Sequence, residues 1–256
     1  MIQKNIIINN LKISYYLSSE LDFDKDILVF LNGWQSQGLV FKKIVQDKNN
    51  VVLLDIPGCG GSDIPKDIWG LSEYAVFLEN FLEKLKILNP ILIGHSFGGS
   101  IIIKYLSKEK QAQKAILIGS AGVRTKSVAI KFWSLASKIL KIPFNLLFPK
   151  KIKEKIRKKF YKMIGSDYLE SGELKEIYGK IINEDLQEEM QKIKIPITLI
   201  WGELDQETPL ENGVLMNKLI KNSRLEIIKN AGHYSFLDQE EEFKKVFNKA
   251  LDSVII

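Results

Sequence analysis

Residues 91–99 have the sequence ILIGHSFGG, and this stretch decides the fold. An apolar run rich in β-branched residues ends at Gly94, Ser96 stands between two glycines in G-H-S-F-G, and the next residues, SIIIKYL, can continue as a helix. The pattern predicts a strand that turns sharply into a helix, with the serine at the apex in a strained backbone conformation. Because roughly one chain in ten of this length contains G-x-S-x-G by chance, the surrounding sequence has to show what it means.

Strands and helices alternate on both sides of this turn. Buried strands are predicted at 26–34, 51–55, 114–122 and 195–201 in addition to the strand that begins at 91, and helices are predicted at 39–47, 72–87 and 100–106. A hairpin with its turn at Asn9-Asn10 precedes them, and a strand at 224–229 and a helix at 239–251 follow. The order predicts an α/β fold, with a mostly parallel eight-stranded sheet and helices on both faces.

Two helix starts carry capping signals. Thr208 is predicted to be the N-cap of one helix, with Pro209 in its first position and Glu211 completing a capping box. Asp238 is predicted to be the N-cap of the last helix.

The alternation stops between residues 123 and 192, which show helical periodicity but no convincing strand. This segment predicts an inserted helical domain within a core formed by residues 1–122 and 193–256. From 124 to 162 it holds 13 Lys or Arg and one acidic residue, a balance of +12, whereas the rest of the chain has 24 basic and 30 acidic residues, a balance of −6. A solvated lysine-rich surface is the favoured interpretation, and the alternatives are weak contact with an anionic membrane surface and binding of an anionic substrate.

Composition narrows the functional classes. No apolar run is long enough for a transmembrane helix, and the N-terminal residues lack the features of a signal peptide. A single cysteine, Cys59, excludes an intramolecular disulfide, and together these features predict a cytoplasmic protein. Cys59, His95 and His233 do not form a metal-binding motif, and the glycines of DIPGCGGSD do not match a nucleotide-binding loop, so we expect no metal, cofactor or nucleic acid.

The candidate catalytic residues are few. A serine hydroxyl needs a base to take its proton, and the base needs an acid to orient it. Of the two histidines, His95 adjoins Ser96 on a sharp turn that should direct its side chain elsewhere, so His233, in the loop after the last strand, is the predicted base.

Two acids, Glu203 and Asp205, follow the strand at 195–201. We favour Asp205, because Glu203 lies closer to the strand end and has a longer side chain. Ser96, Asp205 and His233 all follow the carboxyl ends of predicted strands, where open α/β sheets place their sites.

The motifs LNGW, DIPGCGGSD, GHSFGG, GSAG, WGELD and NAGHY, in this order, resemble those of the α/β-hydrolase fold superfamily over nearly the whole chain outside the insertion. The resemblance implies that the insertion is a cap over the active site, and that the backbone N–H groups of Trp34 and Phe97 form an oxyanion hole. Relatives commonly have His-Gly where this chain has Asn32-Gly33, a change that should leave a backbone donor in place. We expect the side chain of Trp34 to border the acyl pocket.

The sequence therefore predicts a serine hydrolase that cleaves small carboxylic esters through an acyl-enzyme. An apolar cap segment, in which Phe132, Trp133 and Leu146 are the proposed pocket residues, favours an acyl substrate. The nearest alternative is a lactonase, including one for acyl-homoserine lactones. A thioesterase, a proline-type aminopeptidase, a carbon–carbon bond hydrolase and a non-catalytic binding protein on the same fold also remain open, as does the oligomeric state.

Overall fold

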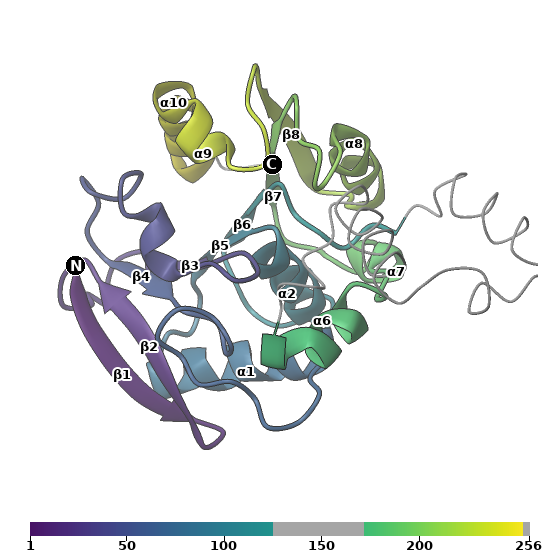
Figure 1. The fold of residues 1–256 in the computed structure, drawn as a ribbon. Coiled ribbons are helices and arrows are strands. Elements are labelled where there is room, and N and C mark those ends of the chain that lie inside the picture. Colours follow the sequence, from purple (N-terminus) through teal and green to yellow (C-terminus); the bar gives the residue numbers. More distant parts are fainter. Residues whose placement is uncertain (125–171, 253–256) are drawn as a thin grey trace, which may run out of the picture.

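The computed structural model describes residues 1–124 and 172–252. Within them, one sheet has the strand order β1-β2-β4-β3-β5-β6-β7-β8 (Figure 1). The strands are β1 Ile2–Ile8, β2 Leu11–Leu17, β3 Leu28–Leu31, β4 Val51–Leu54, β5 Ile91–His95, β6 Lys114–Ile118, β7 Ile197–Gly202 and β8 Ser223–Ile228. Pairing is parallel from β4 to β8 and antiparallel at β1-β2 and β2-β4. The predicted α/β class and eight-stranded sheet are confirmed.

The local signals explain these strands. Asn9 and Asn10 both adopt positive φ angles, 49° and 62°, which is the conformation of the tight turn that joins β1 to β2. The central strands β3 and β4 are buried at every residue, as their unbroken apolar runs predict.

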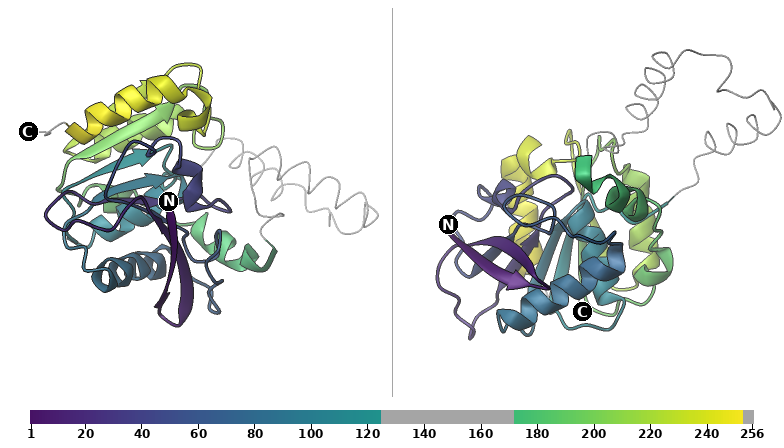
Figure 2. Two further views of the ribbon diagram at one scale, coloured as in Figure 1. Left: turned by 90° about the vertical axis from the view of Figure 1, so that its left-hand side faces the viewer. Right: turned by 60° about the horizontal axis from the view of Figure 1, so that its bottom comes forward.

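Helices cover both faces of the sheet (Figure 2). The buried faces of α1 (Leu71–Lys84), α2 (Phe97–Leu106) and α8 (Leu210–Leu219) share one core cluster. On the other face, η1 (Gly38–Phe41), α9 (Ser235–Asp238) and α10 (Glu240–Asp252) form a second cluster rich in phenylalanine. The two clusters pack against opposite faces of the central strands, and this close packing fixes the positions of the strand ends relative to one another.

The predicted helix at 39–47 is wrong. This region begins with the 3-10 helix η1 and continues as turns, in which N–H groups bond to the carbonyl three residues earlier, as in Ile44 to Phe41 and Lys48 to Val45. Gly38 lies so close to the backbone of β4 that a Cβ would be 2.9 Å from the carbonyl carbon of Leu53. This close approach fixes the start of the segment, and its apolar side chains are buried in successive tight turns instead of along an α-helical stripe.

Both predicted capping roles are also wrong. Helix α8 begins at Leu210 with Pro209 as its N-cap, and the Thr208 hydroxyl instead contacts Asp205. Asp238 ends α9, and its carboxylate accepts a hydrogen bond of 2.8 Å from the N–H of Gly232. In each case the side chain that the local pattern assigned to a helix end bonds instead to a residue of the preceding loop.

The inserted segment is described only in part. Residues 125–171, which include the proposed pocket residues Phe132, Trp133 and Leu146 and most of the basic excess, lie outside the described residues. The remainder contains η3 (Gly172–Leu174), α6 (Lys175–Ile181) and α7 (Gln187–Met190). The ring of Tyr178 on α6 lies 5.1 Å from that of Trp34, so this part of the insertion packs beside the loop after β3. The division into core and cap remains a prediction.

Across residues 1–124 and 172–252, no helix is both long enough and apolar enough to span a bilayer.

We expect Gly98→Ala to destabilise the protein strongly. A methyl group there would overlap the carbonyl oxygens of Leu31 and Asn32, which are backbone atoms that cannot rotate away. Overpacking of this kind costs about 3 kcal/mol, or roughly 6–12 °C in melting temperature for a chain of this size. Thermal unfolding followed by circular dichroism measures the shift.

Gly172→Ala is the matched control. Unlike Gly98, Gly172 has a positive φ, 51°, but among the described residues an added Cβ would have no neighbour within 4 Å, so the change introduces backbone strain without overlap. We expect a loss about half as large, and equal losses for the two variants would contradict the steric argument.

Candidate active site

Ser96 lies at the turn between β5 and α2 with φ 50° and ψ −111°, a strained conformation for a residue with a side chain. Its backbone is anchored on both sides: the Ser96 N–H donates to the Ile118 carbonyl at 3.0 Å, and its carbonyl accepts from the Ala121 N–H at 3.1 Å. Gly94 makes the tight turn possible, since a Cβ there would lie 2.6 Å from the N of Gly99. The predicted nucleophile therefore occupies a fixed apex at the carboxyl end of β5.

Asp205 and His233, from the loops after β7 and β8, form a buried pair. The Nδ1 of His233 lies 2.8 Å from Oδ2 of Asp205. Because a carboxylate can only accept, Nδ1 carries the proton, and Nε2 of the neutral ring has the lone pair needed by a base. Gly119, which follows β6, packs directly against the pair: a Cβ there would be 3.1 Å from Oδ2 of Asp205 and 3.3 Å from Nδ1 of His233. The predicted acid and base are thus brought together.

Thr208 completes the surroundings of Asp205, a role that the sequence analysis missed. Its hydroxyl lies 2.9 Å from Oδ2 of Asp205 and 3.0 Å from the Gly119 carbonyl. The N–H groups of Glu207 and Thr208 both donate to Oδ1 of Asp205 at 2.9 Å. Burial alone would raise the pKa of Asp205, but the hydrogen bonds from His233 and Thr208 and the proximity of the imidazole outweigh it and hold the pKa below its usual range.

His95 supports the loop that carries His233. Its Nε2 lies 3.0 Å from the carbonyl oxygen of His233, so this nitrogen carries a proton and donates it. Burial, reinforced by the neighbouring His233, lowers the pKa of His95 to about 3. The two imidazole centroids lie 4.6 Å apart. His95 is therefore unsuited to be the base, and the bond between Asp238 and Gly232 holds the same loop from its other side.

Glu207 brings a second carboxylate to the pair. Its Oε2 lies 3.4 Å from Nε2 of His233, and its side chain is 53% exposed. Two acceptors do not attract each other, so this contact is favourable only when Nε2 carries a proton. No sequence motif singles out Glu207, whose proximity to His233 depends on the conformation of the loop between β7 and α8.

The residues expected to form the oxyanion hole lie next to each other. The rings of Trp34 and Phe97 meet edge to face at 5.3 Å, and a Cβ on Gly33 would lie 3.5 Å from Cβ of Ser96. The loop after β3 therefore runs beside the serine. Tyr178 packs on the Trp34 ring from the insertion, an aromatic contact that the sequence analysis did not identify.

Cys59 is buried beside the same loop, and burial raises the pKa of its thiol to about 11. It is a protonated thiol at neutral pH, which makes it a poor second nucleophile. Among the described residues, no cluster of three or more His, Cys, Asp or Glu side chains could hold a metal ion.

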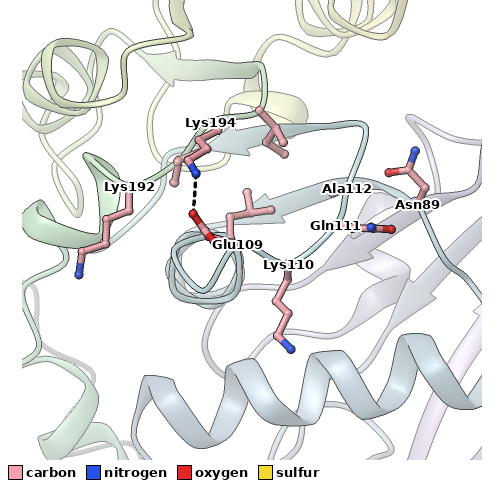
Figure 3. Close-up of a pocket in the computed structure, with 10 residues that line it drawn as sticks. Asn89, Glu109, Lys110, Gln111, Ala112, Lys192 and Lys194 are labelled. Carbon is pink, nitrogen blue, oxygen red and sulfur yellow. Dashed lines mark hydrogen bonds and ion pairs between the residues drawn. The ribbon is translucent and has the colours of Figure 1, made fainter.

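A pocket of about 260 Å³ lies at the opposite edge of the sheet (Figure 3). It is lined by residues that precede β5, β6 and β7, including Asn89, Lys110 and Lys194, and Lys194 pairs with Glu109 at 2.5 Å. The pocket therefore lies at the amino ends of these strands, whereas Ser96 follows the carboxyl end of β5. Open α/β sheets bind substrates at the carboxyl ends of their strands, so this pocket is separate from the site around Ser96.

Residues 26–140 match the family described as alpha/beta hydrolase fold. An esterase from Exiguobacterium antarcticum has the same fold, with a TM-score of 0.73 and 22% identity over 99% of this chain and 100% of that one. The chain therefore has the α/β-hydrolase fold, and its residues 26–140 resemble that family in sequence. Its relatives include an uncharacterized hydrolase, YugF, of Bacillus subtilis, 27% identical over 82% of this chain and 84% of the relative. Another is a proline iminopeptidase of Saccharolobus solfataricus, 26% identical over 80% and 76% of the two chains.

We expect Asp205→Asn to reduce stability in a pH-dependent manner. Because the folded pKa of Asp205 is lowered, its ionised form stabilises the fold fully at pH values above the ordinary aspartate pKa of about 4, and this stability is lost as the pH falls through the folded pKa. Urea unfolding at pH 7, 5, 4 and 3 should show a gap between wild type and variant that narrows toward pH 3. A gap that stays constant over this range would contradict the lowered pKa.

Proposed function

We propose that this α/β hydrolase is a serine hydrolase of carboxylic esters, with Ser96 as nucleophile, His233 as base and Asp205 as the acid that orients it. The observation that carries the proposal is the buried contact of 2.8 Å between His233 Nδ1 and Asp205 Oδ2. This contact leaves Nε2 as the basic nitrogen, at the carboxyl ends of the strands, where Ser96 also lies. A base in this tautomer accepts the serine proton as the hydroxyl attacks the ester carbonyl.

The proposed reaction has two stages. Attack of Ser96 Oγ forms a tetrahedral intermediate, and collapse breaks the bond to the alcohol, which leaves with the proton carried by His233. Water, deprotonated by His233, then attacks the acyl-enzyme. As the bond from the acyl carbon to Ser96 Oγ breaks, His233 returns the proton to Oγ and the carboxylic acid is released. The negative charge of Asp205, preserved by its donors, stabilises the imidazolium in both stages.

In this proposal the oxyanion of each intermediate is bound by the N–H groups of Phe97, which follows the nucleophile, and Trp34. Each such donor contributes around 3 kcal/mol to the transition state. The contacts among Trp34, Phe97 and Tyr178 support an apolar surface for the acyl group, with Trp34 at its border.

Ser96→Ala should reduce ester turnover by at least about 10³-fold, because no other group replaces the nucleophile. Activity is measured on a panel of chromogenic esters, lactones, thioesters and aminoacyl amides, and a fluorophosphonate probe with peptide mass mapping identifies the labelled serine. Ser107→Ala, at the end of α2, is the matched control and should leave turnover and labelling unchanged. Full turnover by Ser96→Ala would refute the mechanism, and a preference for another panel class would correct the substrate.

The position of Glu207 predicts that the site distinguishes leaving alcohols by their charge. His233 Nε2 delivers the proton to that alcohol, and the Glu207 carboxylate lies beside the same nitrogen. Charges about 6 Å apart interact by roughly 0.7 to 3 kcal/mol across the range of effective dielectric found at protein surfaces. The proposed site should therefore disfavour esters whose alcohol bears a negative charge.

We expect Glu207→Gln to raise kcat/KM about tenfold for an ester with an anionic alcohol relative to its neutral analogue with the same acyl group. The difference should shrink in high salt, which screens a half-exposed charge. Glu203→Gln is the control, since the Glu203 carboxylate bonds instead to the N–H of Asn230. An unchanged preference in Glu207→Gln would show that this carboxylate does not face the leaving group.

A further inference from the structure

Asn32 occupies an unusual position for an amide side chain. It directly follows β3 and is completely buried. Its Oδ1 accepts a hydrogen bond of 3.0 Å from the N–H of Ile56, and its Nδ2 donates to the carbonyl oxygen of Gly33 at 2.8 Å. A buried amide is retained at low cost only when both of its ends are bonded, and here they tie the loop after β3 to the loop after β4.

The Gly33 carbonyl oxygen collects three donors. Besides Asn32 Nδ2, it accepts from the Ser36 N–H at 3.2 Å and from Cys59 Sγ at 3.9 Å. A carbonyl oxygen has two lone pairs, so three donors restrain its direction tightly and draw electron density toward it.

This carbonyl belongs to the same peptide group as the N–H of Trp34. The peptide is planar, and in the trans form its C=O and N–H point in opposite directions. Because the donors hold the Gly33 oxygen toward the core, the Trp34 N–H points away from the core. Polarisation by donors at the oxygen also strengthens the N–H as a donor, by about 10–30% per bond.

The peptide lies beside the nucleophile. A Cβ on Gly33 would be 3.5 Å from Cβ of Ser96, and the Trp34 ring contacts that of Phe97. We propose that Asn32 is a positioning residue for catalysis: by bonding the Gly33 carbonyl together with Cys59, it orients and polarises the Trp34 N–H that binds the oxyanion. This role rests on the serine hydrolase function proposed above.

The test is Asn32→Asp, assayed at pH values where the new carboxyl is ionised: it keeps the shape and the acceptor for the Ile56 N–H but has no donor for Gly33. Loss of a whole oxyanion donor costs 10²–10³-fold in kcat, so a misdirected donor should lower kcat about 10- to 100-fold with little change in KM. The affinity for a trifluoromethyl ketone, whose serine adduct carries an oxyanion, should fall in parallel with kcat.

Asn50→Asp is the matched control. Asn50 is a buried amide whose Nδ2 bonds the Asp22 and Asp26 carbonyls before β3, at the opposite end of the strands. Its variant should lose stability comparably yet keep the kcat and inhibitor affinity of the folded enzyme. Cys59→Ala is a second test at the same carbonyl, in which a neutral side chain replaces a weak donor, and it should lower kcat about two- to threefold at constant KM.

The outcomes separate the two proposals. If turnover requires Ser96 but Asn32→Asp and Cys59→Ala keep wild-type kcat and inhibitor affinity, the role of Asn32 is overturned and the hydrolase mechanism stands. If Asn32→Asp does not fold, unchanged kcat in Cys59→Ala overturns it, and a fall in kcat and inhibitor affinity at constant KM supports it. Full turnover by Ser96→Ala overturns both.

Discussion

The close approach of the first turn of α2 to the carboxyl end of β3 is the constraint on which the rest of the site depends. It exists because Gly98 has no side chain to separate the helix from the carbonyls of Leu31 and Asn32. Parallel pairing places Leu31 opposite Gly94, so the loops after β3 and β5 leave the sheet together. The strained φ of Ser96 follows from this packing. Strain of this kind, about 1–3 kcal/mol, persists only where the surrounding structure fixes it, and two buried cores hold these strands.

A second constraint is the cost of burying Asp205. A buried carboxylate is unfavourable unless its lone pairs are satisfied, and removal from water works against the charged form. Two backbone N–H groups, the Thr208 hydroxyl and His233 Nδ1 together reverse that cost and leave Asp205 ionised. The backbone N–H groups of Glu207 and Thr208 and the Thr208 hydroxyl thus act on the charge of Asp205, and through it on the tautomer of His233. The same short loop also sets Glu207 beside Nε2, so one segment determines both the base and the charge next to it.

The sequence predicted the structural features that depend on local patterns, namely the central strands and the turn at Ser96. Unbroken apolar runs located the central strands, and glycines at fixed offsets located the turn at Ser96. Asp205 was preferred to Glu203 on side-chain length, and in the structure Asp205 contacts His233 whereas Glu203 bonds to Asn230. Thr208 and Asp238 match the pattern of helix caps, but their side chains bond to groups 3 to 89 residues away, and these bonds leave no periodic signal in the sequence. The turns between 38 and 47 have apolar spacing close to that of an α-helix, so spacing alone could not distinguish them.

Residue 32 shows why motif identity is an incomplete guide to such a site. The groups proposed to bind the oxyanion are backbone N–H groups, so side chains act there by fixing peptide planes. A peptide transmits the direction of its C=O to its N–H. Any side chain that donates to the Gly33 oxygen can therefore set the direction of the Trp34 N–H, and in this chain that side chain is Asn32. The physical variable to compare between members of the superfamily is the orientation of this peptide, and the donors around its oxygen control that orientation.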